Sequence, residues 1–380
     1  MLINELPDDC LLAIFDYIQD IKDLINLFKV FEKWRDIIAD RTKKIKYLIG
    51  QPNYSHDYVC LHLKEPIDVT CLSTLFPNLR IAEFSYPFNR RAPIEDMVQL
   101  IRDSESLKGI ICHWDYYLNF ELIPENENFE MFSAGYIDPN ISGVYENVKQ
   151  LHLLNSNLGL FECAAHCFPN LERLKIYATD GTEEQSSEAP VLANLKILEM
   201  CLPVDHWNYI WCSFMDACPA LQSAYFKIES RRYRFTDWIK HASLQDLVIQ
   251  FDHLYEPFEW DRLRGLISKY PNLKHLALRN TYLKEEHIKQ LILILPKLTL
   301  LDIRKSYGFP REVARHVGEF CKRYGRSIKF YIGSCDEQIE SDWPQILNRP
   351  DKICRGFDFM EHCFFKSFDN LPYFLDPMDD

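Results

Sequence analysis

Residues 273–278 read Leu-Lys-His-Leu-Ala-Leu, and this six-residue frame decides the fold that the sequence predicts. Apolar residues occupy its first, fourth and sixth places. The same frame starts at Val148, Leu171, Leu195, Leu244 and Leu298, and more loosely at Tyr58, Leu79, Leu107 and Leu221. A unit of this length cannot bury its own apolar face, so the sequence predicts a stack of similar units.

The residues around the frame indicate what each unit contains. A proline lies two residues before several starts, at Pro77, Pro169, Pro219 and Pro271, where it ends a helix and begins a turn. Helical apolar patterns precede these turns at 211–217 and 263–268, and a further one occupies 287–295. Each unit is therefore expected to run helix, turn, strand.

This pattern resembles the leucine-rich repeat. The resemblance implies an α/β solenoid shaped like a horseshoe, with a parallel sheet on the concave face and helices outside. We expect this solenoid over residues 49–335, followed by a cap or tail over 336–380. The period breaks at 113–144, where an aromatic and acidic stretch predicts an insertion or a degenerate repeat.

The first forty-eight residues have a different pattern. Leu11, Ile14 and Phe15 lie on one face of a short predicted helix that begins near Pro7, and further apolar residues extend to Trp34. So short a segment has too little chain to bury all these side chains. Either the following domain or a partner must cover the rest.

The order Leu-Pro, Leu, Ile-Phe, Asp-Leu, Val and Trp-Arg between residues 6 and 35 is similar to the F-box motif. The resemblance implies an F-box domain over 1–48 that binds a Skp-type adaptor and, through it, a cullin. Phe31 departs from the motif, because the family often has Cys there. The alternative is a plain helical cap on the repeats. The adaptor-binding residues carried over by resemblance are Leu6, Pro7, Leu11, Ile14, Phe15, Leu24, Val30 and Trp34.

A second candidate site lies on the predicted strands. Side chains alternate along a strand, so the third, fifth and seventh places of each frame are expected to line the concave face. In the frames that start at Val148 through Leu298, these places hold five Lys or Arg and three Asp or Glu, on a chain of net charge −13. A client with an acidic or phosphorylated segment would fit; the alternative is an ordinary mixed surface. The candidate client-binding residues are Arg173, Lys175, Tyr177, Tyr225, Lys227, Arg279 and Arg304.

The C-terminal residues 336–380 combine 4 Lys or Arg with 11 Asp or Glu and many aromatic residues. They are too aromatic for a disordered tail. One interpretation is a cap on the open end of the last repeat. The other is a return along the concave face, in which the last residues, including Asp376, reach toward Arg279 and Arg304.

Composition excludes several functions. An acidic chain without a cluster of basic and aromatic residues predicts no nucleic-acid partner. The apolar run at 291–295 is far too short to cross a membrane, and acidic residues near the start argue against a secretory signal, so we expect a cytoplasmic or nuclear protein. Cys163, His166 and Cys167 fit helical packing better than a metal site, and no phosphate-binding glycine loop is present.

Together these patterns predict a protein without enzymatic activity, metal or cofactor. The two resemblances imply the substrate-recognition subunit of an SCF-type ubiquitin ligase, which binds the adaptor through its F-box and a client protein through its repeats. The alternative is a non-degradative leucine-rich-repeat scaffold that is tethered to the Skp-type adaptor.

Overall fold

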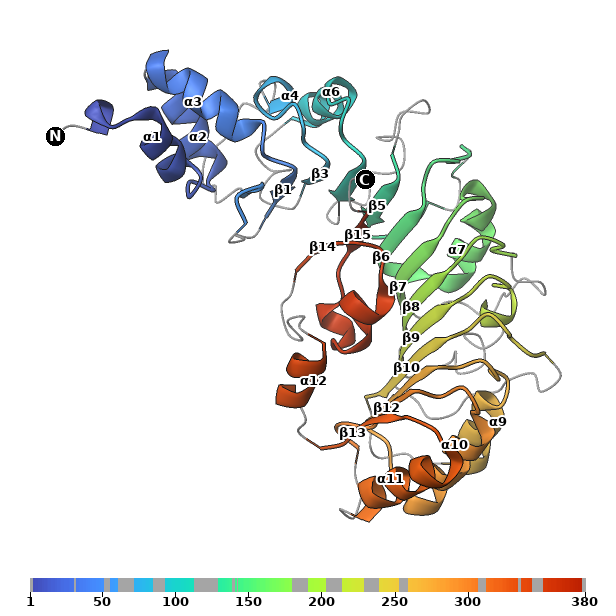
Figure 1. Ribbon diagram of the computed structural model, residues 1–380. Coiled ribbons are helices and arrows are strands. Elements are labelled where there is room, and N and C mark those ends of the chain that lie inside the picture. The colour runs from blue at the N-terminus through green and yellow to red at the C-terminus, as the bar shows by residue number, and fades with distance from the viewer. Residues whose placement is uncertain are drawn as a thin grey trace. The chain divides into compact units, whose positions relative to one another are not determined.

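A computed structural model gives the fold of the chain (Figure 1). It describes residues 3–30, 32–50, 55–60, 72–84, 93–112, 129–138, 141, 143–179, 191–202, 214–228, 239–252, 259–306, 312–333, 336–343 and 351–377. The chain divides into two compact units, 1–138 and 139–380.

The first unit combines the N-terminal helices with a small sheet. Its helical elements are η1 (Ile3–Glu5), α1 (Asp8–Phe15), α2 (Ile21–Val30), α3 (Glu32–Thr42), α4 (Leu72–Leu75) and α6 (Ile94–Asp103). Its strands are β1 (Tyr47–Ile49), β2 (Tyr58–Cys60), β3 (Ile81–Glu83), β4 (Gly109–Cys112) and β5 (Met131–Ala134). They pair in parallel in the order β5-β4-β3-β1-β2. The predicted helix near Pro7 is thus present as α1, and α2 and α3 carry the further apolar residues up to Trp34.

The second unit contains the longer parallel sheet. Its strands are β6 (Gln150–Asn157), β7 (Arg173–Thr179), β8 (Ile197–Leu202), β9 (Ser223–Ile228), β10 (Asp246–Phe251), β11 (His275–Arg279), β12 (Leu300–Asp302) and β13 (Lys329–Tyr331). They pair in sequence order, and equivalent frame residues lie opposite one another, as Leu247 does to Leu276. Frame residues such as Leu276 and Leu278 are fully buried. The predicted α/β class and parallel sheet are confirmed.

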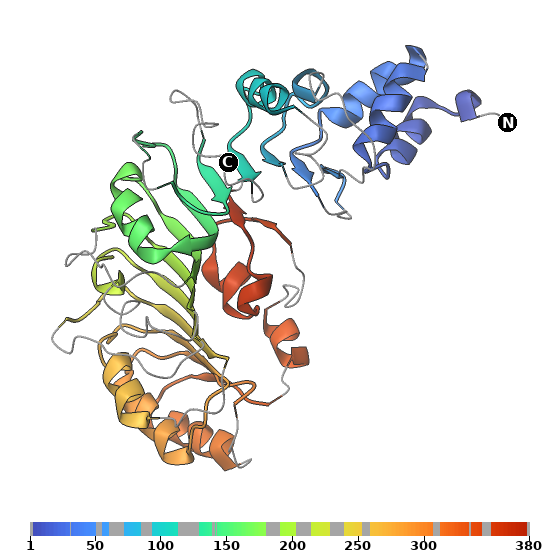
Figure 2. The ribbon, with the colours of Figure 1, turned by 180° about the vertical axis from the view of Figure 1, so that it is seen from behind.

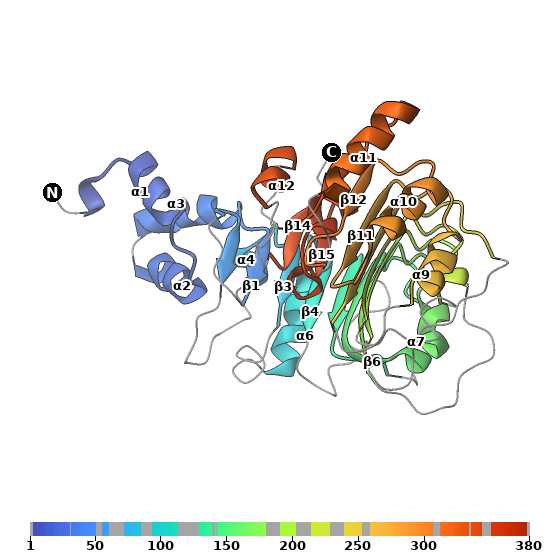
Figure 3. The same ribbon diagram turned by 90° about the horizontal axis from the view of Figure 1, so that it is seen from below.

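Helices cover one face of this sheet. Figures 1 and 3 show α7 (Leu158–Ala164), α9 (Trp260–Ile267), α10 (Glu285–Ile294) and α11 (Glu312–Tyr324) on the same side of the strands. The predicted helices at 263–268 and 287–295 correspond to α9 and α10. The frame's apolar side chains therefore form a core between sheet and helices, and the alternate side chains point to the other face.

Short polar side chains tie neighbouring repeats together beside the turns that contain proline. Asn170 donates to the carbonyl of Glu146 at 2.9 Å, and Asn272 donates to the carbonyl of Ala242 at 2.7 Å. Ser243 makes the equivalent bond to the carbonyl of Pro219 at 2.7 Å. These bonds satisfy carbonyl groups that the strands leave outside the ladder.

Two strands lie where the sequence predicted no regular repeat. β5 occupies part of the stretch expected to be an insertion or a degenerate repeat, and its frame of Phe129, Phe132 and Ala134, all buried, fits the degenerate repeat. β1 lies between β2 and β3, so the loosely predicted start at Tyr58 belongs to the edge strand of this sheet. The rest of the Tyr58 frame and residues 113–128 lie outside the described part of the chain.

The C-terminal segment is a folded element on the opposite face of the second-unit sheet from the helices (Figures 1 and 2). It contains β14 (Ile353–Arg355), the π-helical turn η4 (Met360–Phe364), the 3-10 turn η5 (Phe368–Asn370) and β15 (Phe374–Asp376), and α12 (Asp336–Asp342) precedes it. β14 and β15 pair in parallel, which closes the segment on itself. We call residues 351–377 the cover segment.

Candidate functional site

The predicted client-binding residues lie together on the face of the sheet that carries the cover segment. Arg173, Lys175, Tyr225, Lys227, Arg279 and Arg304 each contact it by a hydrogen bond or ion pair, and Tyr177 packs against Phe368 with ring centroids 5.0 Å apart. The positions predicted to share a face do share it. They are, however, covered by this chain.

Two arginines hold the end of η4. Arg279 donates to the carbonyls of Phe364 at 2.5 Å and Lys366 at 2.6 Å, and Arg304 donates to the carbonyl of Phe365 at 3.4 Å. The last carbonyls of a helical turn lack partners within the turn and carry partial negative charge. The guanidinium groups therefore cap η4.

Asp302 balances these arginines from the sheet. It is fully buried and lies 3.3 Å from Arg279 and 2.9 Å from Arg304. Burial acts to raise the pKa of Asp302, but the two guanidinium groups outweigh it and hold the pKa below its ordinary value. Because all three charges are buried, removing one partner would leave an uncompensated charge.

Arg173 makes a similar anchor farther along the cover segment. It donates to the carbonyls of Pro372 at 2.8 Å and Tyr373 at 3.0 Å, and it also bonds to the buried Glu199 at 2.7 Å and to the amide oxygen of Gln150 at 3.3 Å. Gln150, on the neighbouring strand β6, binds the next part of the cover segment. Its amide N–H donates to the carbonyl of Leu375 at 2.6 Å, and its amide oxygen accepts from the N–H of Leu375 at 2.9 Å. No local sequence pattern predicts this pairing, whose partners are 225 residues apart.

Lys175 is buried in an aromatic cage. Its ammonium donates to the carbonyl of Leu371 at 2.8 Å and lies 5.2–5.7 Å from the ring centroids of Tyr177, Phe368 and Tyr373. Desolvation lowers the pKa of Lys175 to about 8, although the nearby Glu199 carboxylate opposes the shift. The cage compensates only part of the cost of burying the charge.

Tyr225 and Lys227, both on β9, also contact the cover segment. Tyr225 accepts a hydrogen bond from Arg279 at 2.9 Å and lies 3.1 Å from the carbonyl of Lys366, to which its hydroxyl can donate. Burial raises the pKa of Tyr225 to about 12. Lys227 is more accessible and forms ion pairs with Asp252 at 3.2 Å and Asp369 at 3.1 Å.

Apolar side chains seal the cover segment onto the sheet. They pack against Tyr225, Val248 and Ala277 in one core, and the cover residues in it are Cys354, Phe359, Met360, Cys363, Phe364, Phe365, Phe368, Leu371 and Leu375. Each large side chain that is buried in this way contributes roughly 1.5–3 kcal/mol before the entropy cost of ordering the segment, so exposing all of them together would be strongly unfavourable. The cover segment is therefore a constitutive part of the second unit.

The cover segment lies along the face of the sheet, as the second C-terminal interpretation expected, but in the opposite direction to the one expected. Residues 364–366 meet Arg279 and Arg304, whereas the last described residues reach Gln150. The expectation that Asp376 and the residues after it approach Arg279 and Arg304 is wrong for Asp376, which lies in β15 beside β14. Asp379 and Asp380 lie outside the described residues.

The residues predicted to bind the adaptor fall into a buried group and an exposed group. Leu11 and Phe15 are buried with Trp34 in a small core, in which the Phe15 and Trp34 rings meet edge to face at 5.6 Å. Leu24 is also fully buried, and Leu6 is half-buried. Among the residues carried over from the F-box, only Pro7 and Ile14 have exposed side chains in the described part of α1–α3. The side chain of Val30 lies outside that part.

An exposed strip runs along the free face of α1. Pro7, Cys10, Ile14 and Tyr17 follow one another at helical spacing, and Ile14 and Tyr17 are 41% and 88% exposed. We call these four residues the α1 strip. Sequence reasoning missed Cys10 and Tyr17, although their spacing from Pro7 and Ile14 was the available signal.

Other chemistry is not evident in the residues described here. No three His, Cys, Asp or Glu side chains within them gather so as to hold a metal ion. His166 lies 3.5 Å from Cys167, but Cys163 is exposed and uses only its backbone carbonyl toward His166. None of the helices in the described part of the chain combines the length and apolar character needed to cross a bilayer.

Comparisons with known proteins give no family for this chain. No family model matches it, and no curated protein matches it. Among solved structures, a Bacteroides fragilis protein determined as a structural-genomics target aligns at 16% identity with a TM-score of 0.38. The alignment covers 67% of this chain and 73% of that one.

Proposed function

We propose that this protein is the substrate-recognition subunit of an SCF-type ubiquitin ligase, with the α1 strip as the contact surface for a Skp-type adaptor. The observation that carries the proposal is the division of α1 into a buried face and an exposed apolar strip. Such a strip is costly to leave in water and typical of a surface that a partner covers.

The repeat unit would supply recognition of a client protein. A parallel sheet with one helix-covered face and regularly spaced frames fits a leucine-rich-repeat horseshoe, and such repeats are widely suited to protein binding. The chain itself would supply no catalytic group; it would bring the client close to the ubiquitin-transfer machinery. The donors of Arg173, Lys175 and Arg279 are bonded to carbonyls of the cover segment, so we place client binding on surfaces that remain exposed.

The adaptor contact can be tested with the purified full-length chain and a purified Skp-type adaptor. The double variant Ile14→Glu, Tyr17→Glu puts two charges into the α1 strip without touching the core of Leu11, Phe15 and Trp34. We expect adaptor affinity to fall at least hundredfold, because desolvating charged groups in an apolar contact is costly. Calorimetric titration or surface plasmon resonance measures the change.

A matched control is Val191→Glu, which places the same charge at an exposed apolar residue of the second unit, where Val191 is 72% exposed. This variant should bind the adaptor like the unmodified chain, and both variants should keep the unmodified circular dichroism spectrum. Adaptor binding that survives in a folded double variant, or that is absent in the unmodified chain, rules the proposal out.

The alternative is a non-degradative scaffold that is tethered to the same adaptor. Both functions use the α1 strip, so they are separated by assembly with a cullin. Reconstitution of adaptor, cullin and this chain, followed by ubiquitin transfer to a captured client, supports the ligase subunit. A complex that holds the adaptor but excludes the cullin supports the scaffold.

A further inference from the structure

A groove lies on the helical layer of the second unit, between α10 and α11. Its floor consists of Ile288, Ile292, Val313 and Val317, all of them buried, and its volume is about 480 Å³. This size and apolar lining are typical of sites for small ligands. Along α10 the groove extends from Glu285 to Leu293, about 12 Å at 1.5 Å per residue.

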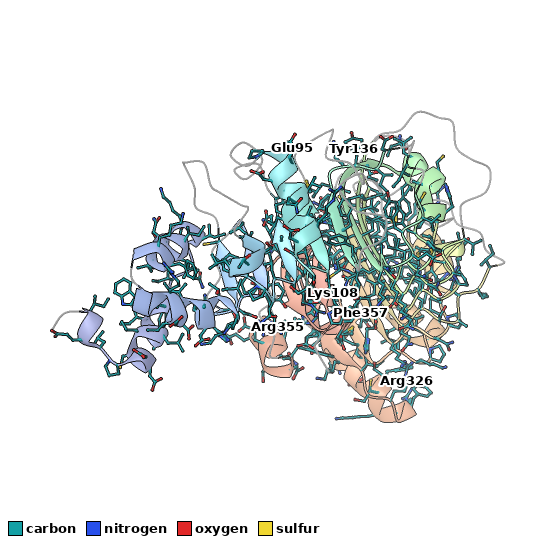
Figure 4. The ribbon with its side chains drawn as sticks, turned by 90° about the horizontal axis from the view of Figure 1, so that it is seen from above. Glu95, Lys108, Tyr136, Arg326, Arg355 and Phe357 are labelled. Atoms are coloured by element: carbon teal, nitrogen blue, oxygen red, sulfur yellow. The ribbon has the colours of Figure 1, made fainter. Side chains whose placement is uncertain are left out.

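The rim of the groove is apolar at one end. Leu293 and Tyr324 are 66% and 60% exposed, which is unusual for such large side chains. The rings of Phe320 and Tyr324 are tilted by 38° with centroids 4.6 Å apart, and the guanidinium of Arg326 lies over the Phe320 ring at 5.8 Å. Arg326, labelled in Figure 4, is itself fixed by hydrogen bonds to the carbonyls of Ile292 and Leu295 at 2.7 and 2.8 Å.

Among the residues that the structure describes, the charged side chains around the groove are paired except for Arg323. At the start of α10, Glu285 is balanced by Lys289 at 2.6 Å and by His316 at 2.7 Å. Glu319 is paired with Arg315 at 3.2 Å. Arg323 also lines the groove and is exposed, and it has no ion pair with any residue that the structure describes. The groove therefore presents an apolar floor with an unpaired guanidinium at the end near Tyr324.

We propose that this groove binds a small amphipathic carboxylate, such as a medium-chain aliphatic acid. Its hydrocarbon chain lies on Ile292, Val317 and Phe320, and its carboxylate pairs with Arg323. The apolar floor selects the chain, and the guanidinium, whose planar donors match a carboxylate, selects the acid over an amine or an alcohol. The proposal is independent of the adaptor contact, because α10 and α11 belong to the second unit.

Decanoate is the probe, titrated into the full-length chain by calorimetry below its micellar concentration, with decanol and decylammonium as the neutral and cationic counterparts. For a ligand of this size in an open groove we expect one site with a dissociation constant on the order of 0.1–1 mM. Each CH₂ added from hexanoate to decanoate should tighten binding about two- to fourfold.

The variant Arg323→Gln should weaken decanoate about tenfold or more and leave decanol unchanged, which loss of the fold would not do. The control Lys322→Gln removes the adjacent exposed cation, which does not line the groove, and should leave decanoate affinity within twofold. Absence of saturable binding, equal affinity for decylammonium, or equal weakening by both substitutions overturns the proposal. If decanoate binds the Leu293→Glu variant as tightly as the unmodified chain, its site lies outside this groove and the proposal is overturned.

Discussion

Lys175 offers the sharpest test of the cover segment, because burial of its ammonium makes the stability of the second unit depend on pH. The pKa of Lys175 is lowered from 10.5 to about 8 in the folded protein. Below pH 8 both the folded and the unfolded state carry the proton. Between about pH 8 and 10.5 the unfolded state binds more protons than the folded state, so the free energy of unfolding contributed by Lys175 rises with pH.

The magnitude follows from the size of the shift. A difference of about 2.5 pKa units corresponds to roughly 3 kcal/mol, of which we expect about 2–3 kcal/mol to develop between pH 7 and pH 10. Buried cysteines act in the opposite direction, because burial raises the pKa of the Cys354 and Cys363 thiols. Their effect is common to the unmodified chain and a Lys175 variant, so the difference between the two isolates Lys175.

The perturbation is Lys175→Met, which keeps the length of the side chain and removes the charge. Urea unfolding is measured at pH 7, 8, 9 and 10 for the unmodified chain, for this variant and for the control Lys196→Met, whose side chain is 43% exposed. The unmodified chain should gain about 2–3 kcal/mol relative to Lys175→Met over this range. The control difference should stay flat. A flat or falling difference for Lys175→Met would mean that the ammonium is not buried under the cover segment.

Two further predictions concern the same cover. A chain that ends at residue 350 is expected to aggregate or to melt far below the full-length chain, because the apolar side chains around Tyr225 and Val248 become exposed. A chain that ends at Asn370 keeps η4 and should lose less stability. Thermal unfolding of both chains measures the difference. Tyr225→Phe should lower the free energy of unfolding by about 1–3 kcal/mol in urea titrations, because Arg279 and the carbonyl of Lys366 each lose a buried hydrogen-bond partner. A decrease below about 0.5 kcal/mol would contradict these hydrogen bonds.

Local periodicity was sufficient to predict the parallel sheet and the side of its strands that the core occupies. The frame placed the apolar side chains of β7, β10 and β11 in the core and assigned Arg173, Lys175 and Arg279 to a common face, since a strand alternates its side chains. β1 was not predicted, because its frame ends on the small residue Gly50. For β5 the sequence left an insertion and a degenerate repeat open, because an aromatic stretch precedes it and its frame ends on Ala134.

The contents of that face could not be predicted in the same way. The residues that cover Arg173, Lys175 and Tyr225 lie between 141 and 200 positions farther along the chain, and nothing in a local pattern specifies such a partner. The α1 strip shows the same limit. A helical pattern identifies an apolar face, but only packing against Trp34 decides that Phe15 is inside and Ile14 is outside.

The cover segment also explains why an acidic chain concentrates positive charge on one face of its sheet. Most of residues 356–373 is not in strands, so its buried carbonyls have no sheet ladder to satisfy them, and an unsatisfied buried carbonyl is costly. Arg and Lys carry several donors and no acceptor, and their long side chains reach from the sheet to the segment above it. Arg173, Lys175 and Arg279 use their donors in this way. The cover segment therefore requires the excess of cations on this face. An acidic client would have to displace both the carbonyls of the cover segment and its apolar core before it reached these cations.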